Sequence, residues 1–208
     1  MPKYFRDRSQ AGRLLAERLV EYASNPATIV LALPRGGVPV ARDVARALKA
    51  QLDLYIVRKI GAPGDPEFAV GAIGSGGARL VDQGTARRLG VNDRELEKAI
   101  ALQSGELHRR EQLYRGDHPF PDLAGRIVLL IDDGAATGAT MRCAIRGVRA
   151  LHPAAIVVAL PVAPPETVDL LRHEADRVVA LIAPPFFFAV GEWYDDFRQV
   201  TDEEATLT

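Results

Sequence analysis

The chain has 208 residues, and its 26 lysines and arginines nearly balance 27 aspartates and glutamates, giving a formal net charge of −1. Apolar residues make up 48% of the sequence, which excludes an intrinsically disordered chain, and the balanced charge argues against a non-specific nucleic-acid binder. The single cysteine, Cys143, excludes an intrachain disulfide framework and favours a reducing, cytoplasmic setting. No apolar run approaches the roughly 20 residues of a membrane helix, so we expect one domain over residues 1–208 and no membrane span.

The chain begins with an amphipathic helix followed by a buried strand. Apolar residues recur at helical spacing over residues 8–24, where an Asn-Pro pair should end the helix. The continuous apolar run 28–33 predicts a parallel strand covered on both faces. A helix over 38–50 and a second strand over 53–57 should follow.

Residues 61–81 have a different composition. The stretch 61–77 carries six glycines and two prolines, which predicts a flexible loop, or a loop with a short hairpin. A strand at 68–73 and its partner at 79–81 are the elements expected there.

The rest of the chain alternates helices with buried strands. A long charged helix is expected over 91–114, with Asn92 as its cap and Glu95 completing a capping box. The acidic tail beyond Trp193 should form a solvated helix. Further strands are predicted at 126–131, 156–160 and 177–182, and further helices at 137–151 and 165–173. This alternation predicts an α/β fold of three layers, a mainly parallel sheet with helices on both faces.

The most informative stretch is IVLLIDDGAATGATM, residues 127–141. A buried strand ends in Asp132 and Asp133, a loop of small residues follows, and a helix begins near Thr137. The amides of such a loop and of the first helical turn converge on an anion, which the helix dipole also attracts. Thr137 and Thr140 add hydroxyl donors. The stretch therefore predicts an anion site beside two carboxylates, the alternative being an ordinary strand-to-helix turn with two solvated acids.

Other phosphate-binding motifs do not fit this stretch. A Walker A loop has four residues between its glycines and then a lysine. Here three residues separate Gly134 from Gly138, and Ala139 follows. The dinucleotide fingerprint and the G-x-S-x-G elbow are also missing from the sequence.

The stretch resembles the 5-phosphoribosyl-1-pyrophosphate (PRPP) motif of type I phosphoribosyltransferases. This resemblance implies that Asp132 and Asp133 hold the ribose hydroxyls and that the following loop holds the 5-phosphate. The loop residues so assigned are Gly134, Ala135, Ala136, Thr137, Gly138, Ala139 and Thr140.

Two further segments match the pyrophosphate-binding parts of that family. Pro-Arg-Gly-Gly after the first strand resembles the loops of xanthine-guanine and adenine phosphoribosyltransferases, so Arg35, Gly36 and Gly37 are assigned to pyrophosphate. The resemblance also implies a basic pair after the second strand, which Arg58 and Lys59 supply. Lys59 and Arg35 are the candidate catalytic cations. Alone, the first segment would suit an ordinary turn with an exposed arginine, and the basic pair would more often mark a solvated strand edge.

The glycine-rich stretch 61–77 occupies the place of the family's flexible catalytic loop. Closure of such a loop would exclude water from a reactive sugar cation. The carboxyl groups of Asp65 and Glu67 in this loop could reach the reacting base, and Glu67 is our candidate catalytic acid. A solvent-facing role is the alternative for both.

Residues 184–208 should form the hood that covers the acceptor base, together with the C-terminal tail. Phe187, Phe188 and Trp193 would stack on a planar base, although these rings would also suit a cover for the sheet edge. The segment resembles in part the F-V-V-G-x-x-x-D-Y-x-x-x-F-R end of hypoxanthine-guanine phosphoribosyltransferases. Those enzymes carry an Asp at the position of Ala136, whereas adenine phosphoribosyltransferases have Ala there, like this chain. The identity of the acceptor base therefore stays open.

The resemblance implies transfer of phosphoribose from PRPP to a nitrogenous base, a purine by preference, with release of pyrophosphate. Mg²⁺ would be held mainly by substrate oxygens, with no protein metal ligand assigned. The expected partners are PRPP and a nucleobase, not nucleic acid, and a homodimer is expected. A PRPP-binding regulator and a transferase with an unusual acceptor are the alternatives.

Overall fold

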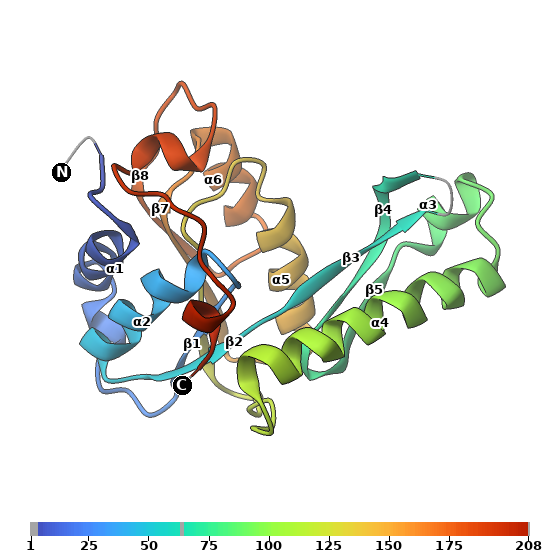
Figure 1. Ribbon diagram of the computed structural model, residues 1–208, viewed down its shortest axis with the longest axis horizontal. Coiled ribbons are helices and arrows are strands. Elements are labelled where there is room, and N and C mark those ends of the chain that lie inside the picture. The colour runs from blue at the N-terminus through green and yellow to red at the C-terminus, as the bar shows by residue number, and fades with distance from the viewer. Residues whose placement is uncertain (1–3, 63–64, 208) are drawn as a thin grey trace.

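The computed structural model describes residues 4–62 and 65–207, and of residues 65–69 it describes only the backbone. A five-stranded parallel sheet of order β2-β1-β6-β7-β8 forms the centre (Figure 1). Because Ala32 of β1 lies opposite Ile131 of β6, the loops after these strands begin at the same level. The strands are β1 Thr28–Ala32, β2 Gln51–Leu54, β6 Ile127–Ile131, β7 Ala155–Val162 and β8 Arg177–Ile182.

Helices cover both faces of this sheet, which confirms the predicted α/β fold. Alternate strand residues point to opposite faces, so Val30 packs with α1 and α2 while Leu31 packs with α5 and α6. Both faces are apolar, as the continuous apolar runs predict. The helices are α1 Arg8–Glu17, α2 Gly37–Leu48, α5 Ala139–Arg149 and α6 Pro165–Arg172.

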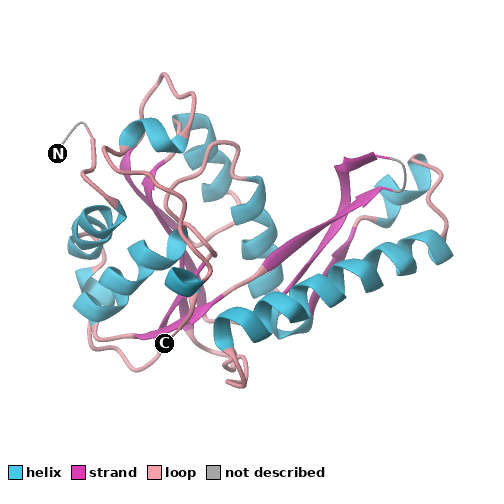
Figure 2. Ribbon diagram, viewed as in Figure 1, coloured by secondary structure: helices cyan, strands magenta, loops and turns pink. Residues whose placement is uncertain are grey.

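Residues 57–115 project from the core as a separate unit, which we call the arm (Figures 1 and 2). An antiparallel sheet of order β3-β4-β5 packs against its long helix, α4. The strand predictions at 68–73 and 79–81 are confirmed, and of the two forms predicted for this stretch the structure shows the hairpin, with longer paired strands than expected. The arm elements are β3 Val57–Ala62, β4 Asp65–Gly74, β5 Ala78–Val81, α3 Gln83–Arg88 and α4 Asp93–Arg115.

The predicted capping box of the long helix is confirmed. The Asn92 side chain accepts a hydrogen bond from the Glu95 amide, and the Glu95 carboxylate accepts one from the Asn92 amide, both at 3.0 Å. These bonds satisfy backbone donors that a helix start leaves unpaired.

Buried contacts join the arm to the core. The Arg115 side chain, 3% exposed, donates from Nε to Asp53 Oδ1 at 2.8 Å and from Nη2 to the Leu54 carbonyl at 2.7 Å. The Tyr55 ring lies against Gly74 and Gly147, where an added Cβ would come within 2.5 and 2.2 Å of the hydroxyl oxygen. Side chains at these two glycines are therefore excluded by packing.

The C-terminal tail is not the solvated helix predicted from its charge. It forms short 3₁₀ turns, η3 Val190–Trp193 and η4 Glu203–Ala205. Val200 and Ala205 are buried in the core, and the Leu207 amide donates to the Tyr114 carbonyl at 2.9 Å. Burial of these apolar side chains draws the tail across the sheet edge to the base of α4. Over the described residues, we find no helix with the length and apolar character needed to cross a membrane.

Candidate functional site

The loop after β6 packs tightly and ends at the start of α5. An added Cβ at Gly134 would lie 2.6 Å from Val190 Cγ1, and Gly138 has a positive φ of 69° at the N-cap of α5. The buried Thr167 hydroxyl donates to the Ala136 carbonyl at 2.5 Å. Thr137 and Thr140 remain exposed. The packing and the Thr167 hydrogen bond therefore hold the loop in place, while the hydroxyls of Thr137 and Thr140 stay exposed beside the start of α5.

The loop after β1 rests directly on the acid pair. An added Cβ at Gly36 would lie 2.2 Å from Asp133 Oδ2, and one at Gly37 would lie 2.7 Å from the Ile131 carbonyl oxygen. The Pro34–Arg35 peptide bond in this loop is cis. The two segments predicted to bind different parts of one ligand thus meet at Asp133, because glycine allows their backbones to approach.

Arg8 at the start of α1 also reaches the acid pair, and sequence reasoning missed it. Its Nε donates to Asp133 Oδ2 at 2.8 Å, and its guanidinium lies 3.9 Å from the centroid of the Phe197 ring. Tyr194, which is buried, donates from its hydroxyl to the Asp133 carbonyl at 2.6 Å. The sequence contains no pattern that links Arg8 to an acid 125 positions away.

Burial and mutual repulsion govern the charge of the two acids. Burial raises the pKa of Asp132 well above its usual value, and the neighbouring charge of Asp133 raises it further. Burial also raises the pKa of Asp133, against the opposing effect of the Arg8 guanidinium. A buried carboxylate pair with one member held by an arginine can accept hydrogen bonds from adjacent hydroxyls.

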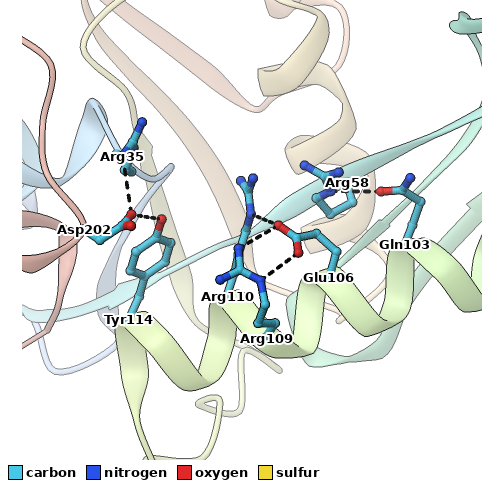
Figure 3. A network of polar contacts seen from close by, with 8 residues as sticks. All are labelled: Arg35, Arg58, Gln103, Glu106, Arg109, Arg110, Tyr114 and Asp202. Carbon is cyan, nitrogen blue, oxygen red and sulfur yellow. Dashed lines mark hydrogen bonds and ion pairs between the residues drawn. The ribbon is translucent and has the colours of Figure 1, made fainter.

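Arg35 faces a cleft of about 380 Å³ beside the acids. Its Nη1 lies 3.5 Å from Asp202 Oδ1 in the tail, and Tyr114 at the end of α4 donates to the same oxygen at 2.7 Å (Figure 3). This network connects the loop after β1 to the tail and the arm. The cleft is lined by Arg8, Arg35, Gly36, Asp133, Phe197, Gln199 and Val200.

Arg58 and Lys59 do not follow a core strand as expected, and neither lines this cleft, so their assignment to pyrophosphate stays a prediction. They lie inside β3 in the arm, where consecutive side chains point to opposite faces. Arg58 donates from Nε to Gln103 Oε1 on α4 at 3.0 Å (Figure 3). Lys59 lies toward α5: burial raises the pKa of the Cys143 thiol, and the charge of Lys59 opposes that shift.

The aromatic residues of the hood differ in their accessibility. The Trp193 ring lies between Tyr4, at a centroid distance of 5.8 Å, and Phe187, at 6.5 Å. Phe188 is 85% exposed. Stacking of a ligand on Trp193 would therefore require one neighbouring ring to move, whereas Phe188 has a free face. The side chains of Asp65 and Glu67 lie outside the described residues.

The described part of the chain contains no group of three or more His, Cys, Asp or Glu side chains arranged to hold a metal ion. Of the two neighbouring acids, Asp133 lines the cleft, and it is already paired with Arg8.

This parallel sheet, with paired acids and a loop of small residues at the carboxyl edge, has the architecture of a phosphoribosyl transferase domain. The sequence matches the phosphoribosyl transferase domain family over residues 6–197, and the chain belongs to that family. The fold is the type I phosphoribosyltransferase fold, as the resemblance implies.

Two relatives with 43% and 46% sequence identity align with nearly the whole chain. A Mycobacterium tuberculosis protein named "Putative phosphoribosyl transferase Rv0571c" is 43% identical over 202 residues, which cover 97% of this chain and 45% of that protein. The chain thus spans about half the length of the curated relatives it matches. The crystal structure of TT1426 from Thermus thermophilus is 46% identical, with a TM-score of 0.82 over 97% of this chain and 95% of that one. AQ2163 from Aquifex aeolicus, 11% identical with a TM-score of 0.50 over 83% and 73% of the two chains, shares the fold.

Proposed function

We propose that the protein transfers the 5-phosphoribosyl group of PRPP to a nitrogenous base, a purine by preference, and releases pyrophosphate. The observation that carries this proposal is the contact of the two loops at Asp133, where Gly36 leaves no room for a Cβ. That contact places Asp133 of the acid pair and the cationic Arg35 on one cleft. A ligand with hydroxyls next to a diphosphate, such as PRPP, would suit both.

The cleft and the loop after β6 would each bind a different part of this substrate. Asp132 and Asp133 would accept hydrogen bonds from the ribose hydroxyls, and the exposed hydroxyls of Thr137 and Thr140 would bind the 5-phosphate at the start of α5. Arg35 would donate to the diphosphate. Because negative charge grows on the diphosphate as its bond to ribose breaks, a cation held there in advance lowers the barrier.

Mg²⁺ fits this site as a companion of the substrate. Asp133, the acid that lines the cleft, is bonded to Arg8, so the diphosphate oxygens would supply most of the ligands of the ion. The ion would neutralise charge on the departing pyrophosphate. Arg35 and the two acids would hold the diphosphate and the sugar in place around it.

Few residues of the described chain point to a particular acceptor base. Phe188 offers a free aromatic face for a planar base, and Ala136 provides no acid that could act on a purine ring. A purine remains our first choice on the resemblance of the hood. We assign the reaction to nucleotide salvage in the cytoplasm.

The test is a calorimetric titration of the protein with Mg²⁺-PRPP, followed by a pyrophosphate assay with a panel of nucleobases. We expect saturable binding, and at least about tenfold weaker binding for Asp132→Asn and Thr137→Ala, because each removes a ligand contact. Asp117→Asn, at an exposed turn after α4, is the matched control and should bind like the parent.

Three results would contradict parts of the proposal. Unchanged affinity in both site variants would refute the site assignment. Binding without pyrophosphate release for any base would favour a PRPP-binding regulator or a transferase with an unusual acceptor. Absence of PRPP binding by the parent would refute the proposed substrate.

A further inference from the structure

Arg8 is held in position by two separate devices. Asp7 caps α1 by accepting a hydrogen bond from the Gln10 amide at 2.7 Å, so the helix begins at Arg8. The Phe5 amide donates to the Trp193 carbonyl at 2.7 Å, which attaches the N-terminal segment to the tail. The position of Arg8 therefore depends on both ends of the described chain.

The guanidinium of Arg8 is surrounded on three sides. Nε donates to Asp133 Oδ2 at 2.8 Å, Nη1 donates to the Arg198 carbonyl at 2.8 Å, and the Phe197 ring covers one face at 3.9 Å. The Arg8 and Asp133 side chains are only 10% and 12% exposed. An ion pair so sheltered from water is not screened as a surface pair is, and removal of one partner leaves a buried charge uncompensated.

The Arg8–Asp133 hydrogen bond also fixes the orientation of the Asp133 carboxylate. The oxygen that Arg8 holds, Oδ2, is the atom that a Cβ at Gly36 would meet at 2.2 Å. Oδ1 of the neighbouring Asp132 accepts from the Asp133 amide at 2.9 Å. Arg8 and Gly36 thus border the same carboxylate oxygen from opposite segments, and Arg8 lines the cleft beside it.

We propose that Arg8 is a positioning residue for the acid pair, which keeps Asp133 ionised and fixed in orientation so that the pair can accept the two ribose hydroxyls. This inference rests on the proposed function and adds a residue from the N-terminal segment to its site. Arg8 acts through Asp133, while Arg35 is the cation assigned to the diphosphate.

The charges around Asp133 explain why such a residue is needed. Asp132 lies beside it, Arg8 faces it from α1, Arg35 borders the same cleft, and the Tyr194 hydroxyl is bonded to its carbonyl. Burial and the neighbouring acid both favour protonation of one member of the pair. Without Arg8, Asp133 would take up a proton at a higher pH and would then accept fewer hydrogen bonds from a sugar.

The test compares Arg8→Met and Arg8→Lys with Arg13→Met, a matched control on the same helix whose exposed guanidinium contacts Ser9. PRPP dissociation constants are measured across pH 5–8. We expect Arg8→Met to weaken binding about tenfold or more at neutral pH, with a larger loss toward acidic pH. KM for PRPP should rise more than kcat falls. Arg8→Lys should recover part of the loss, and Arg13→Met should bind like the parent.

A second measurement does not depend on PRPP. Carbon-13 NMR of the aspartate carboxyls should show Asp133 titrating at higher pH in Arg8→Met than in the parent. Equal PRPP affinity of Arg8→Met and the parent at every pH, or an unmoved Asp133 titration, would overturn the inference. If Arg8→Met does not fold, Arg8→Gln decides, because an unchanged KM at every pH in that uncharged variant would overturn the inference as well.

These readouts separate the two proposals. A parent that binds no PRPP refutes the proposed function, whatever the NMR titration shows. A parent that binds PRPP, with an Arg8→Met variant that only melts at lower temperature, leaves the proposed function standing and removes Arg8 from it.

Discussion

The edge of the core sheet and the arm are joined to the rest of the molecule in different ways. At the sheet edge, the loops after β1 and β6 touch backbone to side chain, with Gly36 against Asp133. The arm is attached at its base by the buried Arg115–Asp53 pair, and farther out its ionic contacts, such as Glu106 with Arg109, are exposed (Figure 3). The residues assigned to the sugar thus lie at the tightly packed sheet edge. Arg58 and Lys59 lie in the arm, where the ionic contacts beyond its base are exposed.

The first way to test this contrast is to remove the anchor of the arm. Arg115→Met leaves Asp53 buried without its partner, and we expect it to lower the free energy of unfolding by about 3 kcal/mol. Arg109→Met, which breaks an exposed contact of the same helix, should cost less than about 1 kcal/mol. Urea denaturation measures both. Similar losses for the two variants would show that the arm has no dominant anchor.

The second test adds one methyl group at the sheet edge. Gly36 has φ −60° and ψ −36°, which alanine adopts freely, so Gly36→Ala acts only through the 2.2 Å contact with Asp133. Overpacking of this kind costs about 1–3 kcal/mol. We expect that cost to appear as weaker PRPP binding, by about 5-fold to 150-fold in titration calorimetry. Unchanged affinity would mean that the two loops separate easily, contrary to the tight packing described above.

The third test measures how the ionisation of Asp132 and Asp133 affects stability at different pH values. The pKa values of Asp132 and Asp133 are raised in the folded protein, so the stability they contribute is full below the usual carboxyl pKa of about 4 and is lost as the pH rises through the raised values. Asp132→Asn removes the ionisation. We expect a melting temperature about 2–4 °C above that of the parent at pH 7, corresponding to roughly 1 kcal/mol, and no gain near pH 3. A gain of equal size at both pH values would assign the effect to hydrogen bonding instead of charge.

The sheet edge could be predicted from sequence because its signals are local. Asp132, Asp133 and the glycines beside them lie within one strand–loop–helix unit, and Arg35 lies within another. Arg8 gave no such signal, because its partner is brought close only by tertiary packing. The boundary between β2 and β3 could not be predicted either. The apolar run continues through the residues that connect the central sheet to the sheet of the arm.

The arm was predicted less well because its glycines were interpreted as loop formers. In the structure Gly76 and Gly77 do form a turn, both with positive φ, but Gly71 and Gly74 serve close packing. A Cβ at Gly71 would lie 2.4 Å from the Leu80 carbonyl oxygen, and one at Gly74 would lie 2.5 Å from the Tyr55 hydroxyl oxygen. Glycine in a strand can mark such a close approach as well as a turn, and composition alone does not distinguish the two.

The smallest expected effect comes from the same glycine-to-alanine change in the arm. Gly105 lies in the middle of α4, is exposed, and has no atom within 4 Å of an added Cβ. Glycine costs a helix interior about 0.5–1 kcal/mol relative to alanine, so Gly105→Ala should raise the free energy of unfolding by that amount and leave PRPP affinity unchanged. Urea denaturation and titration calorimetry measure the two quantities. A loss of stability that grows with protein concentration would instead place this face of α4 against a second copy of the chain, where a methyl group would clash.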